Sequence, residues 1–150
     1  MKGFVECPGF DYNNTFSPVI QFKTIHVMIA IAVEKGLLME HMKVKGAYLN
    51  ETLKETVYMF QPKGFDDETN WICHLKKAIY ELKQSCWEWN EELDNKLRRQ
   101  RYKRLQSNPC MYIRNNKKGL TIITVWIDNL LLFADSAENI KRIKTEILDK

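Results

Sequence analysis

The sequence predicts an α+β domain in which helices pack on one face of a small antiparallel sheet. An apolar helical repeat follows Pro18, two β-branched hairpins follow Met111, and an amphipathic helix follows Ser136. Helices and neighbouring hairpins in this order favour helices layered on an antiparallel sheet over alternating βαβ units. A length of 150 residues, with 45% hydrophobic and 28% charged residues, is typical of a single globular domain.

The first helix is expected to begin at Ser17, which can cap it, with Pro18 at the first helical position. Apolar residues then recur at three- and four-residue spacing until Gly36 ends the helix. One wide face of this helix should therefore be buried. The preceding residues 1–16 mix glycine, proline, asparagine and aromatic residues, and are predicted to form a loop with a short edge strand.

The middle of the chain predicts two short strands and a long helix. Residues 37–44 and 58–60 are the strand candidates, and a turn at 62–64 with an acidic loop at 66–68 follows the second. From residue 72 to about 101 the apolar residues recur at helical spacing, so this stretch is expected to be a helix, with a break allowed near Ser85.

The last third of the chain predicts two hairpins and a helix. Apolar runs at 111–113 and 120–127 bracket the turn sequence 115–119. A second hairpin should have Asp128 and Asn129 at its tip, with 130–133 returning. Ser136 is then expected to cap a helix with apolar residues along one face, namely Ile140, Ile143, Ile147 and Leu148.

Composition excludes several classes of protein. No apolar stretch approaches the ~20 residues of a membrane-spanning helix, and the N-terminus lacks the apolar core of a signal peptide. We therefore expect no membrane association and an intracellular location, in cytoplasm or nucleus. The four cysteines have no pair two to four residues apart, and His26, His41 and His74 have no partner at ligand spacing, so no zinc site is indicated. The net charge of +4 permits a polyanionic partner without requiring one.

Seven short segments carry motifs in a fixed order along the chain. They read KGF, FSPV, MKVKGAYLN, VYMFQPKGF, LKKAIYELKQ, NPCMY and WIDNLL, at residues 2–4, 16–19, 42–50, 57–65, 75–84, 108–112 and 126–131. In this order they resemble the reverse transcriptase domain of copia-type retrotransposon polyproteins. The resemblance implies a polymerase palm with partial fingers. It places the fingers and first helix in 1–36 and the palm in 37–150, with a fingers insertion at about 50–75.

The resemblance also implies a metal site, at which this chain departs from the family. Family members hold two magnesium ions with one aspartate on the first palm strand and two at the hairpin tip. The matching positions here are Lys43, Asp128 and Asn129. Unit charges ~4 Å apart interact by about 4 kcal/mol at an effective dielectric of about 20, so an ammonium at position 43 repels a divalent ion. We expect no bound metal or other cofactor, and an ion pair between Lys43 and Asp128.

Three further positions bear on nucleotide binding by resemblance only. Tyr48 matches the aromatic residue that excludes ribonucleotides, and Gln84 belongs to a motif near the nucleotide. Core packing remains the alternative interpretation of Tyr48. Glu81 replaces a family glycine and adds bulk and negative charge beside the expected phosphates.

Six basic residues between positions 96 and 104 form a stripe without an intervening acid. The stripe consists of Lys96, Arg98, Arg99, Arg101, Lys103 and Arg104. One interpretation is a salt-dependent phosphate-binding surface. The other is a solvated helix end, because acidic residues early in the same helix and basic residues late in it complement the helix dipole.

These observations together predict a degenerate, truncated and catalytically inactive reverse transcriptase domain. Weak binding of RNA, DNA or an RNA–DNA hybrid is one expectation. The alternatives are a module that binds a protein partner across the truncated edges, a relic without binding function, and a residual polymerase.

Overall fold

The computed structural model describes residues 17–50, 52–65, 67, 69, 71–80, 82 and 84–148. Within them the chain forms two compact units. The first, which we call the sheet unit, comprises residues 18–45 and 92–148. The second, the ribbon unit, comprises residues 46–91. The predicted N-terminal loop at residues 1–16 lies outside the described residues.

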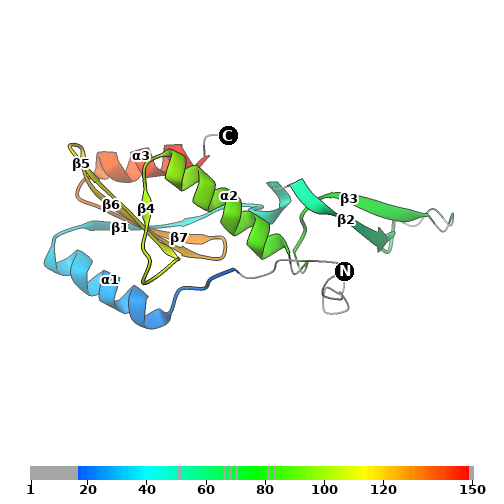
Figure 1. Cartoon of the computed structure of the whole chain (residues 1–150), viewed down its shortest axis with the longest axis horizontal. Coiled ribbons are helices and arrows are strands. Elements are labelled where there is room, and N and C mark those ends of the chain that lie inside the picture. Colours follow the sequence, from blue (N-terminus) through cyan, green and yellow to red (C-terminus); the bar gives the residue numbers. More distant parts are fainter. Residues whose placement is uncertain are drawn as a thin grey trace. The chain divides into compact units, whose positions relative to one another are not determined.

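The sheet unit contains a five-stranded antiparallel sheet with the strand order β1-β7-β6-β5-β4 (Figure 1). The strands are β1 (Leu38–Lys43), β4 (Lys103–Arg104), β5 (Met111–Asn116), β6 (Gly119–Trp126) and β7 (Asn129–Ala134). Both predicted hairpins are present, since β5 pairs with β6 and β6 with β7. The α+β class and the antiparallel sheet predicted from the sequence are confirmed.

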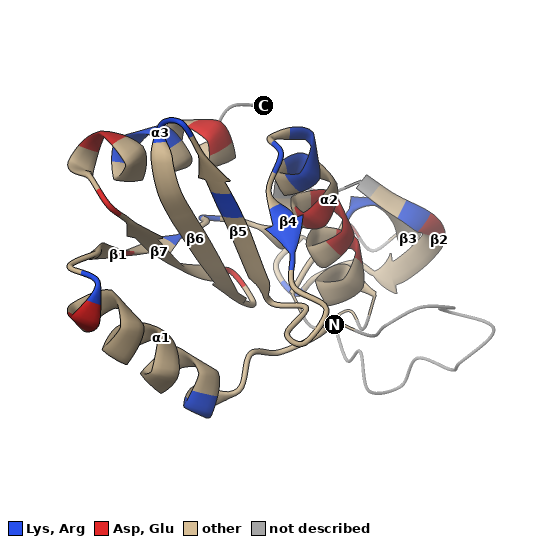
Figure 2. Ribbon diagram, turned by 60° about the vertical axis from the view of Figure 1, so that its left-hand side comes forward, with Lys and Arg blue, Asp and Glu red and all other residues tan. Residues whose placement is uncertain are grey.

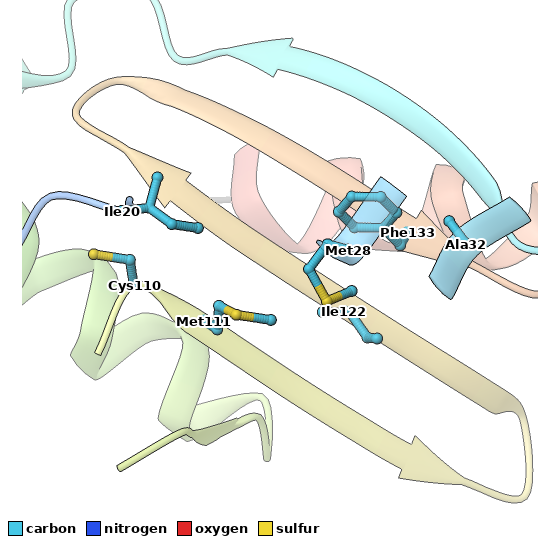
Figure 3. Packing of buried hydrophobic residues seen from close by; sticks show 7 residues of the cluster. All are labelled: Ile20, Met28, Ala32, Cys110, Met111, Ile122 and Phe133. Atoms are coloured by element: carbon cyan, nitrogen blue, oxygen red, sulfur yellow. The ribbon is translucent and has the colours of Figure 1, made fainter. Parts of the chain in front are cut away.

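Helix α1 (Phe22–Glu34) packs on one face of this sheet. Its buried residues Met28 and Ala32 contact a core made of Met111, Ile122 and Phe133 from three neighbouring strands (Figure 3). Because successive strand residues point to opposite faces, this core lies on the face opposite Tyr112 and Arg114.

Helices α2 (Ser85–Arg99) and α3 (Ala137–Leu148) contact the other face of the sheet. The Tyr112 hydroxyl donates to Asp94 of α2 at 2.9 Å, and Arg114 donates to both carboxylate oxygens of Glu146 of α3, at 3.1 and 2.8 Å. Burial raises the pKa of Tyr112, so its hydroxyl stays protonated and remains a donor. The sequence predicts that all helices lie on one face of the sheet. In the structure α2 and α3 share one face, whereas α1 covers the opposite face.

Helix α1 begins four residues later than its sequence predicts. The cap residue is Gln21, which has an extended backbone and no side-chain cap hydrogen bond. Ser17 and Pro18 precede the helix, and the buried Ile20 joins the apolar core before the first turn forms. The packing of Ile20 in the core therefore outweighs the tendency of Ser17 and Pro18 to begin a helix. The predicted end is correct, because Gly36 has φ +63° and Leu37 N–H bonds the Ala32 carbonyl at 2.8 Å.

The ribbon unit contains a two-stranded antiparallel ribbon made of β2 (Thr52–Phe60) and β3 (Ile72–Lys77), with a short 3-10 turn at Tyr48–Asn50. The long helix predicted from residue 72 to about 101 is wrong before Ser85. Residues 72–77 pair with β2 in the register Tyr58↔His74 and Phe60↔Ile72, and α2 begins only at Ser85. In residues 72–77 the apolar positions fit both the alternation of a strand and, in part, the spacing of a helix. Periodicity alone therefore could not distinguish a strand from a helix here.

The C-terminal helix α3 follows the sequence prediction closely. The Ser136 hydroxyl accepts the Asn139 N–H at 3.3 Å, and Ile140, Ile143 and Ile147 are buried, whereas Leu148 is exposed. None of the helices in the described ranges is long and apolar enough to cross a membrane.

Candidate functional site

The hairpin between β6 and β7 brings Lys43, Asp128 and Asn129 together. Ile127 and Asp128 form its two-residue connection, and Asn129 is the first residue of β7. Strand β1 pairs with β7 so that Lys43 lies opposite Asn129, and the Val44 N–H donates to the Asp128 carbonyl at 2.9 Å. Side chains nearly 90 positions apart in sequence therefore lie in one site.

A continuous chain of polar contacts links four side chains at this site. Lys43 Nζ lies 3.5 Å from Asp128 Oδ2, as the sequence predicts. The Asn129 amide donates to Asp128 Oδ1 at 2.9 Å. His41 Nε2 contacts Asn129 Oδ1 at 3.1 Å, and because an amide oxygen only accepts, His41 is the donor. Every donor in this network is thus oriented toward the Asp128 carboxylate or toward the amide that binds it.

The electrostatics of the site follow from this network. Asp128 is buried and has both carboxylate oxygens engaged by the donors of Lys43 and Asn129. One carboxylate and one ammonium leave the pair without net charge. Within the described part of the chain, no group of three or more His, Cys, Asp or Glu side chains could hold a metal ion.

His41 is the member of this site that sequence reasoning missed. The sequence interpretation treats it as an ordinary histidine because it has no partner at ligand spacing. It precedes Lys43 by two positions on β1, and residues two apart on a strand share a face. The period-two rule, applied to the strand that carries Lys43, would have placed His41 on the same face as Lys43, whereas its contact with Asn129 depends on the register between β1 and β7.

The tip of the hairpin has an unusual backbone. Ile127 has φ +59°, in the left-handed region that β-branched residues rarely adopt. A conformation of this kind costs about 1–2 kcal/mol in a residue other than glycine. The turn that presents Asp128 is therefore held in place by the two strands it joins.

The two nucleotide-binding candidates lie in the ribbon unit. Tyr48 is buried, its ring packs edge-on against Tyr80 with centroids 4.8 Å apart, and its hydroxyl lies 3.1 Å from Cys86 Sγ. Gln84 is buried, and neither polar atom of its amide has a hydrogen-bond partner among the described residues. Their nucleotide-binding role stays a prediction, and Glu81 lies outside the described residues.

The basic stripe lies at the C-terminal end of α2 and on β4, where Figure 2 shows a cluster of basic residues. Much of its charge is paired within the unit. Arg98 and Arg104 both contact the Asp94 carboxylate, at 2.7 and 3.5 Å, and Arg99 lies 3.6 Å from Glu92. Acidic residues near the middle of α2 thus partly neutralise the stripe.

The remaining stripe residues differ in their surroundings. Lys96 donates to the backbone oxygen of Ile147 at 2.7 Å. Arg101 and Lys103 are exposed and have no ion pair among the described residues. They are therefore the stripe residues best placed to meet an anion.

Comparison with known proteins identifies the family. All 150 residues match the family model described as reverse transcriptase (RNA-dependent DNA polymerase). The chain belongs to this reverse transcriptase family. The copia-type resemblance inferred from its motifs is confirmed by its relatives, which are retrotransposon polyproteins.

Three relatives illustrate this similarity to reverse transcriptase polyproteins. The Pol polyprotein of transposon TNT 1-94 from Nicotiana tabacum is 30% identical over 98% of the chain, which spans 11% of that protein. The Pol polyprotein of transposon RE1 from Arabidopsis thaliana is 35% identical over 87% of the chain, which spans 9% of that protein. A putative transposon Ty5-1 protein from Saccharomyces cerevisiae is 35% identical over 71% of the chain and 35% of its own length. No solved structure matches the chain.

Proposed function

We propose that this chain is a catalytically inactive reverse transcriptase-like domain that has kept a weak affinity for nucleic acid. The observation that carries the proposal is the ion pair between Lys43 and Asp128 at the position where the family holds its metal ions. The chain spans about a tenth of the TNT and RE1 polyproteins, so the activity of those whole proteins is not assumed for it.

The donor set at this site does not fit magnesium. Mg²⁺ requires oxygen ligands in near-octahedral geometry and is reluctant to lose water. The only carboxylate in the His41–Asn129–Asp128–Lys43 network is Asp128, whose Oδ1 accepts a hydrogen bond from Asn129 and whose Oδ2 is ion-paired with Lys43. An ammonium 3.5 Å from Asp128 Oδ2 would also repel any cation bound there. These features support loss of metal-dependent phosphoryl transfer.

A metal-binding measurement tests this proposal directly. The unchanged chain should show only weak Mn²⁺ binding, without a defined two-site stoichiometry, and no primer extension. The double variant Lys43→Asp/Asn129→Asp should bind Mn²⁺ about tenfold or more tightly than the unchanged chain in isothermal titration calorimetry, since ~1.4 kcal/mol of added attraction gives a factor of ten. Calorimetry is a better primary readout than primer extension, because metal binding does not require the other parts of a polymerase.

Lys45→Asp is the matched control, because Lys45 is exposed near the end of the same strand and the substitution adds negative charge outside the network. It should leave Mn²⁺ affinity close to that of the unchanged chain. Two-site Mn²⁺ binding or primer extension by the unchanged chain would contradict the proposal.

Nucleic-acid affinity is supported by Arg101 and Lys103, the exposed residues of the stripe without an ion pair among the described residues. Each phosphate contact contributes about 0.9 to the slope of log affinity against log salt for duplex DNA. Two contacts therefore predict a slope near 2, whereas six would give a slope above about 5.

Fluorescence anisotropy with a labelled primer-template duplex measures this slope. Raising salt from about 50 to about 200 mM should weaken binding about tenfold if two residues make contact, and about a thousandfold if all six do. Arg101→Glu with Lys103→Glu should abolish the binding at low salt. Arg98→Glu, which alters a residue already paired with Asp94, serves as the comparison and should have the smaller effect. No binding at the lower salt would refute the nucleic-acid part of the proposal and leave the metal result untouched.

A further inference from the structure

The side of α1 that faces away from the sheet is largely apolar. Met28 and Ala32 are buried against the sheet, whereas Val27 and Val33 are 56% and 78% exposed and Ala30 is also exposed. A helix with one apolar stripe is typical of a protein surface, whereas a helix that is apolar all round is typical of one that is covered on every side. The exposed side of α1 is therefore expected to contact a partner.

Four exposed residues form a seam along this side of the helix. Lys23, Val27, Ala30 and Glu34 follow one another at spacings of four, three and four. An α-helix turns by about 100° per residue, so all four lie within about 30° of one line along its surface. We call these four residues the outer seam. Its middle is apolar, and the helix carries no Lys, Arg, Asp or Glu between the two ends of the seam (Figure 2).

The two charges of the outer seam are placed unfavourably for the helix that carries them. Lys23 lies in the first turn, at the positive end of the helix dipole, and Glu34 is the last helical residue, at the negative end. Neither has an ion pair among the described residues. The nearest titratable neighbours on this helix, His26 and the cap residue Lys35, fall about 70° and about 110° from the line of the seam. The seam itself therefore presents one positive and one negative end to a partner.

We propose that the outer seam binds the outer seam of a second copy of this chain, as an antiparallel pair of helices related by a two-fold axis. The midpoint between Val27 and Ala30 is also the midpoint between Lys23 and Glu34. One axis through this point therefore places Val27 of each copy against Ala30 of the other, and Lys23 of each copy against Glu34 of the other. The small side chain of Ala30 allows the helix axes to approach to about 8 Å. This inference is independent of the metal site and of the stripe on α2 and β4.

The charges of the seam determine the direction of the pair and the kind of occupant. A parallel pair would bring Lys23 against Lys23 and Glu34 against Glu34, so only the antiparallel pair joins opposite charges. It also places an acidic residue of each copy beside the positive end of the helix dipole of the other. A nucleic acid would need an excess of basic side chains along its path, whereas the seam carries one basic and one acidic residue.

Sedimentation equilibrium of the full chain, from about 5 to about 500 µM, tests the contact. A pair of 13-residue helices forms a small interface, so we expect a dissociation constant on the order of 100 µM. Val27→Ser should raise it about fivefold or more. Serine and valine have similar helix propensities and Val27 is exposed, so this change should preserve the fold. Phe60→Ser is the matched control, because Phe60 is 86% exposed and lies in the ribbon unit.

Exchange of the two charges tests the direction of the helices. Lys23→Glu alone, or Glu34→Lys alone, places like charges together at both ends of the pair and should raise the dissociation constant about fivefold to tenfold at low salt. The double variant Lys23→Glu/Glu34→Lys joins opposite charges again and should return the constant to within about twofold of that of the unchanged chain. The control Phe60→Ser should leave the constant unchanged.

Thermal unfolding of about 1 µM protein separates association from folding. Each single charge change replaces a residue that opposes the helix dipole by one that complements it, so the monomer should be no less stable than the unchanged chain. A chain that stays monomeric up to about 500 µM would overturn the proposal. So would a double variant that associates no more tightly than the single variants, or a Phe60→Ser effect equal to that of Val27→Ser.

Discussion

Glu88 is a buried carboxyl group in the first turns of α2. Its Oε1 accepts the Lys54 backbone N–H at 3.0 Å, whereas its Oε2 has no partner among the described residues. Burial raises the pKa of this carboxyl above its ordinary 4.5, and the hydrogen bond and charge of Lys54 oppose the rise only in part. The protonated form is therefore favoured in the folded state relative to the unfolded state.

This residue predicts a pH dependence of stability. Because the folded pKa is the higher one, the contribution of Glu88 is complete below its ordinary pKa and is lost as pH rises through the folded pKa. Glu88→Gln keeps an acceptor for Lys54 but cannot ionise, so it should flatten the fall in unfolding free energy between about pH 4 and about pH 7. Urea unfolding at a series of pH values measures the fall. Glu138→Gln, at an exposed position of α3, is the control and should retain the full slope.

The polar network at the hairpin illustrates what a sequence can and cannot provide at this scale. The Lys43–Asp128 pair could be predicted, because the motif order places both residues at one site. The contribution of His41 depends on the side-chain amide of Asn129 being oriented by two neighbours at once, which is a property of the folded register. Likewise, nothing in the sequence indicates that the Gln84 amide is buried with no hydrogen-bond partner among the described residues.

At the scale of elements, α1 has an N-cap residue that makes no side-chain capping hydrogen bond. Gln21 occupies the cap with φ −76° and ψ 140°, makes no side-chain hydrogen bond to the first turn, and no acidic residue follows in that turn. The first turn therefore has neither a side-chain capping oxygen nor an acidic side chain, and of its N–H groups that of Thr24 bonds the Gln21 backbone carbonyl at 2.9 Å.

Substitutions at Gln21 should show how much stability a capping side chain would add to α1. Gln21→Asp places a carboxylate within reach of the first-turn N–H groups and should raise the free energy of unfolding by about 1 kcal/mol. Gln21→Ala, which adds no acceptor, should change it by less than about 0.5 kcal/mol. Thermal and urea unfolding followed by circular dichroism provide the measurement. Equal effects of the two substitutions would mean that the gain does not come from capping.

Elements also differ in how well the sequence predicts them. The β5–β6 hairpin is predictable because its turn requires a glycine, and that glycine is visible in the sequence as Gly119. Gly119 has φ +114°, and a Cβ there would lie 1.9 Å from Asp135 Oδ2. Strand β3 is not predictable in this way. It pairs with β2 across a connection of more than ten residues. Local periodicity cannot report such a contact.

At the scale of the molecule, the sequence predicts the class of the fold and the family but not the layer arrangement. Which face of the sheet receives α1 depends on the side of the sheet that Met111, Ile122 and Phe133 occupy. On the other face, Arg114 is buried, pairs with Glu146 and lies 4.2 Å from the centre of the Tyr102 ring. A charged residue in a β-branched run would be placed on the surface by composition alone. The division into fingers and first helix at 1–36 and palm at 37–150, with a fingers insertion at about 50–75, stays a prediction.

The polar network at the hairpin determines how the site responds when Lys43 or Asn129 is replaced by aspartate. Asn129→Asp alone would bring a second carboxylate into a contact that measures 2.9 Å to Asp128 Oδ1, and Lys43→Asp alone would remove the cation that offsets Asp128. Each single substitution therefore adds negative charge that no cation in the described network offsets. The network therefore disfavours replacing Lys43 and Asn129 by aspartate one at a time, because each single change leaves negative charge that the network does not offset.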